Sequence, residues 1–293
     1  RMEGEDPSPQ MEAGGEVELG GAEKTVHEAF ESFVVEAKEV KELLSTLAEA
    51  PEGNVRINNI LDKYQEQSQL LDPHLEEMVT KLMGIVRSAG AGSLHDNKAA
   101  LRRASSVLYT VTKVRGFKTV VKFMPHEVQD LEPCLDLLDA QDPADHETWE
   151  TRYALLLWLS ILVMVPFSLS TIDSMLCTEP GGGEGLVERI ERVGKACLSD
   201  PGRTRDGAAY LLSRLLTRPD MEEDTLVGFL QWSDATLRST SNTFLPTGIY
   251  STLANVFKYG QRQSLLDKVP LALSILSRDR DEGGGGGGGC ARE

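Results

Sequence analysis

The sequence predicts an all-α protein whose helices are stacked in antiparallel pairs. Apolar residues recur at spacings of three and four along most of the 293 residues, which is the period of amphipathic helices. Strand-like alternation is almost absent, and proline and glycine residues fall where helices would begin and end. Helix pairs in series are typical of HEAT and armadillo repeats. We therefore expect an α-solenoid of HEAT/armadillo-like helix pairs, with a compact helical bundle as the alternative.

The chain is expected to begin with a disordered acidic arm over residues 1–23. These residues are rich in Glu, Gly and Pro and have almost no large apolar side chains, so they cannot offset the entropy cost of ordering. The first 50 residues hold 13 acidic and four basic residues, which accounts for most of the net charge of -16. A first helix is predicted near 24–49, where Val26, Phe30 and Phe33 share one face.

Four helix pairs are predicted after this helix, and their boundaries carry local signals. Asp72-Pro73 and Asp142-Pro143 each place a side-chain acceptor at an N-cap and a proline at the first helical position, and Pro125 starts another helix. Gly116 and Gly260 are among the glycines predicted to end helices. The predicted pairs are 72–89 with 95–114, 125–139 with 147–165, 186–198 with 203–217, and 221–239 with 247–259, followed by a single helix at 262–277.

The predicted pairs form a degenerate array rather than a strict repeat, because their starts are unevenly spaced around the roughly 40-residue period of such folds. We assign residues 24–278 to one N-terminal HEAT-like α-solenoid segment. Residues 279–293 are expected to be a disordered Gly-rich tail, because Gly283–Gly289 is an unbroken run of glycines without side chains to pack.

One apolar segment could be mistaken for a membrane span. Tyr153–Val165 contains 12 apolar residues of 13 and is followed by Pro166. A spanning helix needs about 18 or more such residues, so this length favours a helix buried on all sides in a protein core. We expect no integral membrane segment, and a peripheral membrane role of this helix is the alternative.

The composition and motifs exclude several classes of function. An excess of acidic residues and a pI of about 4.8 argue against nucleic-acid binding. Phosphate-binding loops, dinucleotide fingerprints, metalloprotease motifs and nucleophile elbows are absent from the sequence, and its five histidines and four cysteines are isolated along the chain. We expect no catalytic residues, no metal and no cofactor, and therefore a protein that is not an enzyme.

A short basic strip stands out from this acidic background. Lys113, Arg115, Lys118 and Lys122 lie within ten positions that contain no acid. Lys118 and Lys122 are four residues apart and would share a helix face, while Gly116 would place Arg115 at a turn. The strip is either a contact surface for an acidic protein partner or a solvated face that stabilises a helix C-terminus through its dipole.

Several long strings resemble the N-terminal part of the tubulin-folding cofactor D family, also called tubulin-specific chaperone D. The resemblance runs from about residue 58 to about residue 276 and leaves out the acidic arm and the glycine-rich tail. The strings include Ile60–Gln67 (ILDKYQEQ), Leu70–Glu76 (LLDPHLE), Thr112–Thr119 (TKVRGFKT), His146–Tyr153 (HETWETRY) and Thr217–Asp220 (TRPD).

The resemblance implies a non-enzymatic chaperone scaffold. Members of this family bind β-tubulin and assemble the αβ-tubulin heterodimer together with tubulin cofactors E and C and an Arf-like small GTPase, and they contribute to GTPase activation in the complex. A cytoplasmic location, with association with microtubules and centrosomes, is implied as well. The basic strip would then be a partner-binding surface, because tubulin is acidic.

Two alternatives from other classes remain on the sequence alone. Arg115 could act as an arginine finger on a bound nucleotide, which would make the protein a GTPase-activating protein proper. The chain could also be a truncated and non-functional fragment, because it starts with Arg1-Met2, ends shortly after the glycine run and leaves its last helix without a partner.

Overall fold

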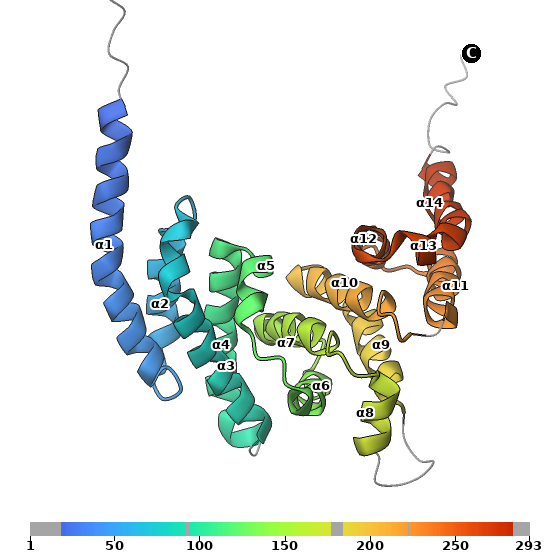
Figure 1. Ribbon diagram of the computed structural model, residues 1–293, viewed down its shortest axis with the longest axis horizontal. Helices are drawn as coiled ribbons and strands as arrows, with labels where there is room; N and C mark the ends of the chain where they lie inside the picture. Colours follow the sequence, from blue (N-terminus) through green and yellow to red (C-terminus); the bar gives the residue numbers. More distant parts are fainter. Residues whose placement is uncertain (1–18, 92–93, 177–183, 222, 284–293) are drawn as a thin grey trace, which may run out of the picture.

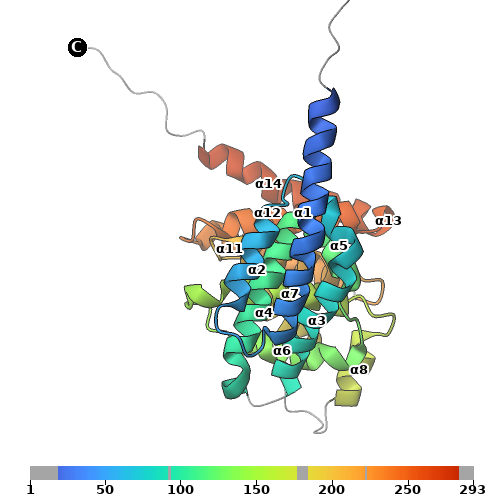
Figure 2. The same ribbon diagram turned by 90° about the vertical axis from the view of Figure 1, so that its left-hand side faces the viewer.

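The computed structural model describes residues 19–91, 94–176, 184–221 and 223–283, and these residues form helices without any strand. The helices curve into an arc that is open on one side (Figure 1), and the view from the end of the arc shows α1 standing in front of the other helices (Figure 2). The predicted all-α solenoid is therefore confirmed.

The helices keep the order of the predicted pairs with some additions. The α-helices are α1 (Leu19–Thr46), α2 (Gly53–Asp62), α3 (Asp72–Ala91), α4 (Leu94–Arg115), α5 (Phe117–Val120), α6 (Leu131–Asp139), α7 (Trp149–Leu162), α8 (Leu169–Leu176), α9 (Leu186–Cys197), α10 (Arg203–Leu216), α11 (Glu223–Ser239), α12 (Leu245–Tyr259), α13 (Arg262–Leu265) and α14 (Val269–Gly283). Short 3-10 turns are η1 (Ser68–Leu71), η2 (Val121–Phe123), η3 (Val128–Asp130), η4 (His146–Thr148) and η5 (Leu266–Lys268).

Two rows of helices make the solenoid. In the inner row, α2, α4, α7, α10 and α12 pack against one another in succession. In the outer row, α3, α6 and α9 each pack against the inner helix that follows them in the chain. Each pair thereby covers the apolar faces of its neighbours, which is how a solenoid builds one continuous core.

The apolar segment at residues 153–165 is the centre of that core. Helix α7 is buried along nearly its whole length because α4, α6 and α10 all pack against it. The indole of Trp158 is 1% exposed, and its Nε1 donates a hydrogen bond of 2.8 Å to the Pro125 carbonyl. Among the residues that the structure describes, no helix meets the length and apolarity required to cross a membrane.

Several predicted boundaries are wrong. Pro125 does not start a helix: Met124 and Glu127 have extended backbones, and α6 begins only after η3. The Trp158 hydrogen bond to Pro125 holds this extended stretch against α7. Helix α7 begins at Trp149, close to the predicted residue 147, but Asp142 is not its N-cap: the Asp142 carboxylate accepts a hydrogen bond from the Ala144 N–H in a local turn.

The C-terminal part also differs from the prediction. The segment expected as one helix at 262–277 is divided into α13, η5 and α14, and α14, whose Ala272 and Ile275 are buried, packs against α11. The last helix is therefore not without a partner. The disordered arm and tail stay predictions that lie mostly outside the described residues; residues 19–23 and 279–283 belong to the outer ends of α1 and α14.

A buried arginine fixes the connection between α7 and α8. The Arg218 side chain is 5% exposed, and its guanidinium donates hydrogen bonds to the carbonyl oxygens of Val163, Val165 (3.1 Å) and Phe167 (2.8 Å). It also binds both carboxylate oxygens of Asp220 at 2.7 and 2.8 Å, and that carboxylate accepts a hydrogen bond from the first N–H of α8, at Leu169. One side chain thus satisfies three carbonyl groups of the turn, of which those of the buried Val163 and Val165 would otherwise lack partners.

Candidate partner-binding face

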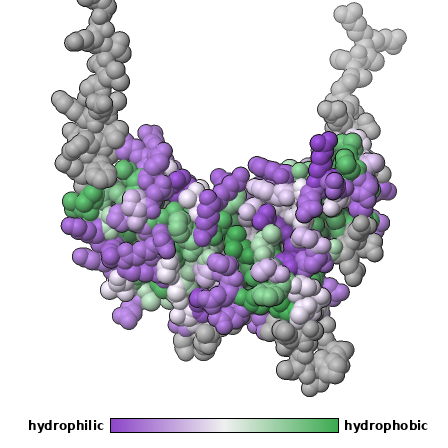
Figure 3. Space-filling model, viewed as in Figure 1, coloured by the Kyte–Doolittle hydropathy of each residue, from purple (hydrophilic) through white to green (hydrophobic). Residues whose placement is uncertain are grey.

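The open side of the arc forms a hollow between the two ends of the solenoid, and mostly hydrophilic residues border it in the space-filling view (Figure 3). Helices α5, α10 and α12 lie along this inner side (Figure 1). A curved surface made by stacked helices suits contact with a large partner, because it presents many side chains over an extended area. The predicted basic strip includes α5 and therefore reaches this face (Figure 1).

The basic strip is located where α4 ends and α5 begins. Gly116 separates the two helices with a φ of 91°, a conformation that favours glycine, and its N–H bonds to the Thr112 carbonyl at 2.9 Å. Lys113 and Arg115 belong to α4, whereas Lys118 follows in α5 and Lys122 in η2. Because the chain turns at Gly116, the four side chains do not form one row.

Two of the four basic residues have intramolecular partners. The ammonium of Lys113 lies 3.0 Å from Asp62 Oδ1 at the end of α2. The Arg115 guanidinium binds both carboxylate oxygens of Asp72 at the start of α3, at 2.5 and 2.9 Å. These hydrogen bonds raise the pKa of Arg115 and lower the pKa of Asp72 from their usual values. Both residues thus connect neighbouring helices.

The other two basic residues are exposed and have no carboxylate partner among the described residues. Lys122 is free on the surface of η2. The Lys118 ammonium lies 5.9 Å from the centre of the Tyr259 ring at the end of α12.

The structure does not support an arginine finger at Arg115 in this conformation, because the Arg115 guanidinium would first have to leave Asp72.

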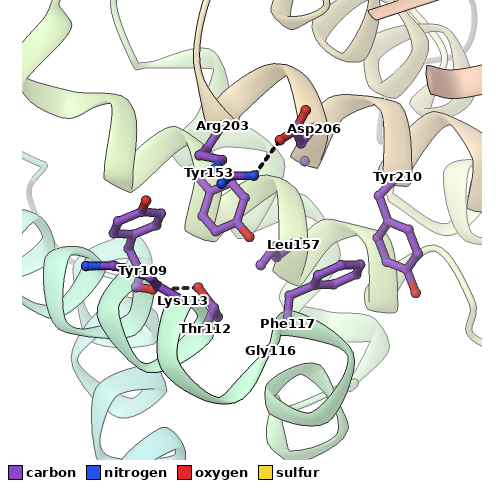
Figure 4. A pocket seen from close by; sticks show the side chains of 11 residues that line it. Tyr109, Thr112, Lys113, Gly116, Phe117, Tyr153, Leu157, Arg203, Asp206 and Tyr210 are labelled. Carbon is purple, nitrogen blue, oxygen red and sulfur yellow. Dashed lines mark hydrogen bonds and ion pairs between the residues drawn. The ribbon is translucent and has the colours of Figure 1, made fainter. Parts of the chain in front are cut away.

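A small pocket of about 230 Å³ opens beside the strip, between α4, α7 and α10 (Figure 4). Aromatic side chains dominate its lining: Tyr109, Phe117, Tyr153 and Tyr210. Arg203 and Asp206 bind each other at 3.2 Å at its edge. The pocket contains no nucleophile beside a base, so its lining is suited to packing against a side chain of a partner rather than to catalysis.

Sequence reasoning missed residues that belong to this face. Tyr259 of α12 lies beside Lys118, and Arg214 of α10 and Lys258 of α12 lie near the same ring, although all three are far from Lys118 in the chain. Nothing in the local sequence around Arg214 or Lys258 distinguishes them from other cations on helices. Within the described residues, no three histidine, cysteine, aspartate or glutamate side chains gather as metal ligands.

Comparison with known proteins yields one family. The model of the family "Tubulin-specific chaperone D-like, ARM repeat" matches residues 61–237, from the end of α2 into α11. The chain is 27% identical to tubulin-specific chaperone D of Dictyostelium discoideum, over 84% of this chain and 24% of that protein. It is 26% identical to tubulin-folding cofactor D of Schizosaccharomyces pombe, over 78% of this chain and 19% of that protein. The chain thus spans a quarter or less of these relatives, and no solved structure matches it.

Proposed function

Since the chain belongs to the tubulin-specific chaperone D-like family, we propose that it is a non-enzymatic scaffold that binds β-tubulin in the hollow of its solenoid. The family match carries this proposal, because it covers the helices α3 to α10 that form the middle of the arc. Its relatives are named as a chaperone and a folding cofactor of tubulin. A rigid curved surface is suited to holding a folded or nearly folded partner of domain size.

The further partners follow from the family. Here β-tubulin would be joined to α-tubulin in a complex that includes tubulin cofactors E and C and an Arf-like small GTPase. The complex would work in the cytoplasm, near microtubules and centrosomes. We propose that the chain contributes to stimulating GTP hydrolysis by holding the complex together rather than by inserting Arg115, because that guanidinium is bound to Asp72.

The basic strip is the proposed contact for the acidic partner, with Lys118 and Lys122 making direct contacts. Both are exposed and free of carboxylates, so an acidic surface would not have to displace an internal ion pair. Lys113 and Arg115 would add to the positive potential while remaining bound to Asp62 and Asp72. Complementary charge of this kind raises the rate of association and selects the partner.

Capture of β-tubulin by the purified chain tests the proposal. We expect the wild-type chain to retain β-tubulin and the Lys118→Glu/Lys122→Glu variant to retain about tenfold less, since each exposed contact contributes up to ~1 kcal/mol. Lys38→Glu/Lys98→Glu is the matched control, because both lysines are exposed and carry the same charge. Equal capture by all three proteins would refute the strip, and no capture by the wild-type chain would refute the function.

Single-turnover GTP hydrolysis by the assembled complex separates the scaffold from the arginine finger. With Arg115→Ala, we expect the rate to stay within about twofold of wild type whenever the complex assembles. A loss of about a thousandfold with binding retained is the signature of a finger and would overturn this part of the proposal.

A further inference from the structure

Three cations surround one tyrosine ring on the inner side of the arc. The Lys118 ammonium lies 5.9 Å from the centre of the Tyr259 ring, the Arg214 guanidinium carbon 5.7 Å and the Lys258 ammonium 5.7 Å. The cations come from α5, α10 and α12: α12 packs on α10, and Phe117 of α5 contacts the Tyr210 ring of α10. We call Lys118, Arg214, Lys258 and the Tyr259 ring the Tyr259 cluster.

None of the three cations has a carboxylate partner among the described residues. Helices α5 and α12 contain no acidic residue, and the only acid of α10 is Asp206, which binds Arg203. The Nε of Arg214 is buried without a hydrogen-bond acceptor. The cluster therefore holds donors and positive charge that the chain itself does not satisfy.

Elsewhere the chain pairs many of its cations with acids, as expected for a protein with a net charge of -16. Arg56 binds Glu39, and Arg189 binds both Asp136 and Asp139. In the Tyr259 cluster, each cation lies within 6 Å of one point, so any two of them are at most about 12 Å apart and within reach of mutual repulsion at low salt. The tyrosine face offsets only part of this cost.

We propose that the Tyr259 cluster binds an acidic segment of a partner protein, whose carboxylates supply the counter-charges that the chain lacks. The proposal rests on the proposed function in one respect, namely that the inner side of the arc receives a partner. Tyr210, whose ring stands edge-on to both Phe117 and Tyr259, extends the cluster toward the aromatic pocket of Figure 4. An acidic segment with apolar side chains between its carboxylates would fit this combination.

A nucleic acid fits the cluster less well than an acidic polypeptide does. Three cations offer few phosphate contacts, and the net charge of -16 repels a long polyanion. A polypeptide segment carries fewer negative charges per unit length than a nucleic acid does. Its carboxylates can therefore be limited to the few positions that face the three cations. The proposal is therefore specific for peptide carboxylates.

Fluorescence anisotropy with a labelled peptide tests the cluster directly. The probe is a fluorescein-labelled peptide of ten residues that alternates glutamate and glycine, and the reference peptide has glutamine in place of glutamate. We expect the full chain to bind the glutamate peptide at least tenfold more tightly than the glutamine peptide. In Lys118→Gln/Arg214→Gln/Lys258→Gln, this preference should be lost.

Two further variants make the result specific. Lys38→Gln/Lys98→Gln removes two exposed positive charges outside the cluster, as many as Lys118→Gln/Lys258→Gln removes from it, and should keep the preference. Lys118→Gln/Lys258→Gln leaves the part-buried Arg214 in place and should weaken binding at least threefold, which covers the case in which the triple variant does not fold. Equal weakening in the cluster and control variants, or none in either cluster variant, would overturn the proposal.

The same proteins separate this proposal from the proposed function. If the wild-type chain fails to capture β-tubulin but binds the glutamate peptide through the cluster, the function fails and the cluster stands. If capture of β-tubulin is intact and the peptide preference is absent, the cluster fails and the function stands.

Discussion

Replacement of Arg218 by methionine should destabilise the fold strongly. Methionine fills most of the same volume without hydrogen-bond donors, so it leaves the carbonyl oxygens of Val163, Val165 and Phe167 without their donor and the Asp220 carboxylate without its counter-ion. Val163 and Val165 are buried, so water replaces the lost donor poorly at their carbonyl oxygens, whereas Phe167 is 59% exposed and water compensates more of the loss there.

The magnitude follows from the number of groups left unsatisfied. Each buried polar group without a partner costs about 1–3 kcal/mol, and the lower end applies to carbonyls because they have two lone pairs. The Asp220 side chain is 25% exposed, so water compensates part of its loss. Together these terms predict a loss of roughly 3–4 kcal/mol. Arg218→Lys keeps the charge but offers fewer directed donors, and should lose about 2–3 kcal/mol.

Urea denaturation followed by circular dichroism gives the free energy of unfolding, and amide exchange at Leu169 gives a local measure, because that N–H is bonded to Asp220. Arg238→Met is the matched control: its partner Asp234 lies one turn away and the Arg238 side chain is 60% exposed, so we expect a loss below about 1 kcal/mol. A loss below about 1 kcal/mol in Arg218→Met, with unchanged exchange at Leu169, would refute the reasoning.

Three further predictions concern helix contacts, acid stability and thiol reactivity. Gly248→Ala should lower the free energy of unfolding by about 1–3 kcal/mol in the same denaturation assay, because the new Cβ would lie 2.5 Å from the Leu198 carbonyl oxygen. Gly228→Ala on an open helix face should raise it by about 0.5–1 kcal/mol, and equal effects of the two variants would contradict the close approach of α12 to Leu198. The Arg115 guanidinium lowers the pKa of Asp72 in the folded protein, so the pair stabilises the fold at pH values above the unfolded pKa of Asp72, and this stabilisation is lost as the pH falls through the folded pKa. Arg115→Gln should raise the pKa of Asp72 measured by NMR, and an unchanged pKa would disprove the pair. Burial raises the pKa of Cys197 to about 11, which lowers its thiolate fraction about a hundredfold. Mass spectrometry should therefore find Cys197 nearly unmodified by iodoacetamide in the folded protein at pH 8 and modified after denaturation, and rapid modification of the folded protein would contradict this prediction.

The helix pairs could be predicted because long amphipathic helices repeat their signal over several turns. Helices α3, α4, α9 and α10 begin and end within a few residues of their predicted bounds. Short elements were missed, since α5 has four residues and α8 has eight, too few to show a period clearly. The proline at residue 125 gave a start signal that the tertiary hydrogen bond from Trp158 overrides.

The candidate site was predictable only in part. Spacing predicted a shared helix face for Lys118 and Lys122, which the structure places in α5 and η2, and a turn near Arg115, where Gly116 does end α4. Spacing could not indicate that Lys113 pairs with Asp62 and Arg115 with Asp72, because the partners are 51 and 43 positions apart in the chain. For the same reason it could not indicate that Arg214 and Lys258 join Lys118.

By itself, the sequence determined the all-α class, the order of the long helices, the family and the unusual basic strip. All of these depend on local period, turn residues or strings of consecutive residues. Only the tertiary structure decided which cations of the strip are bound and which are free. Charge pairing acts through space over a few ångströms, and the packing of α4 on α2 and α3, and of α12 on α10, sets those distances.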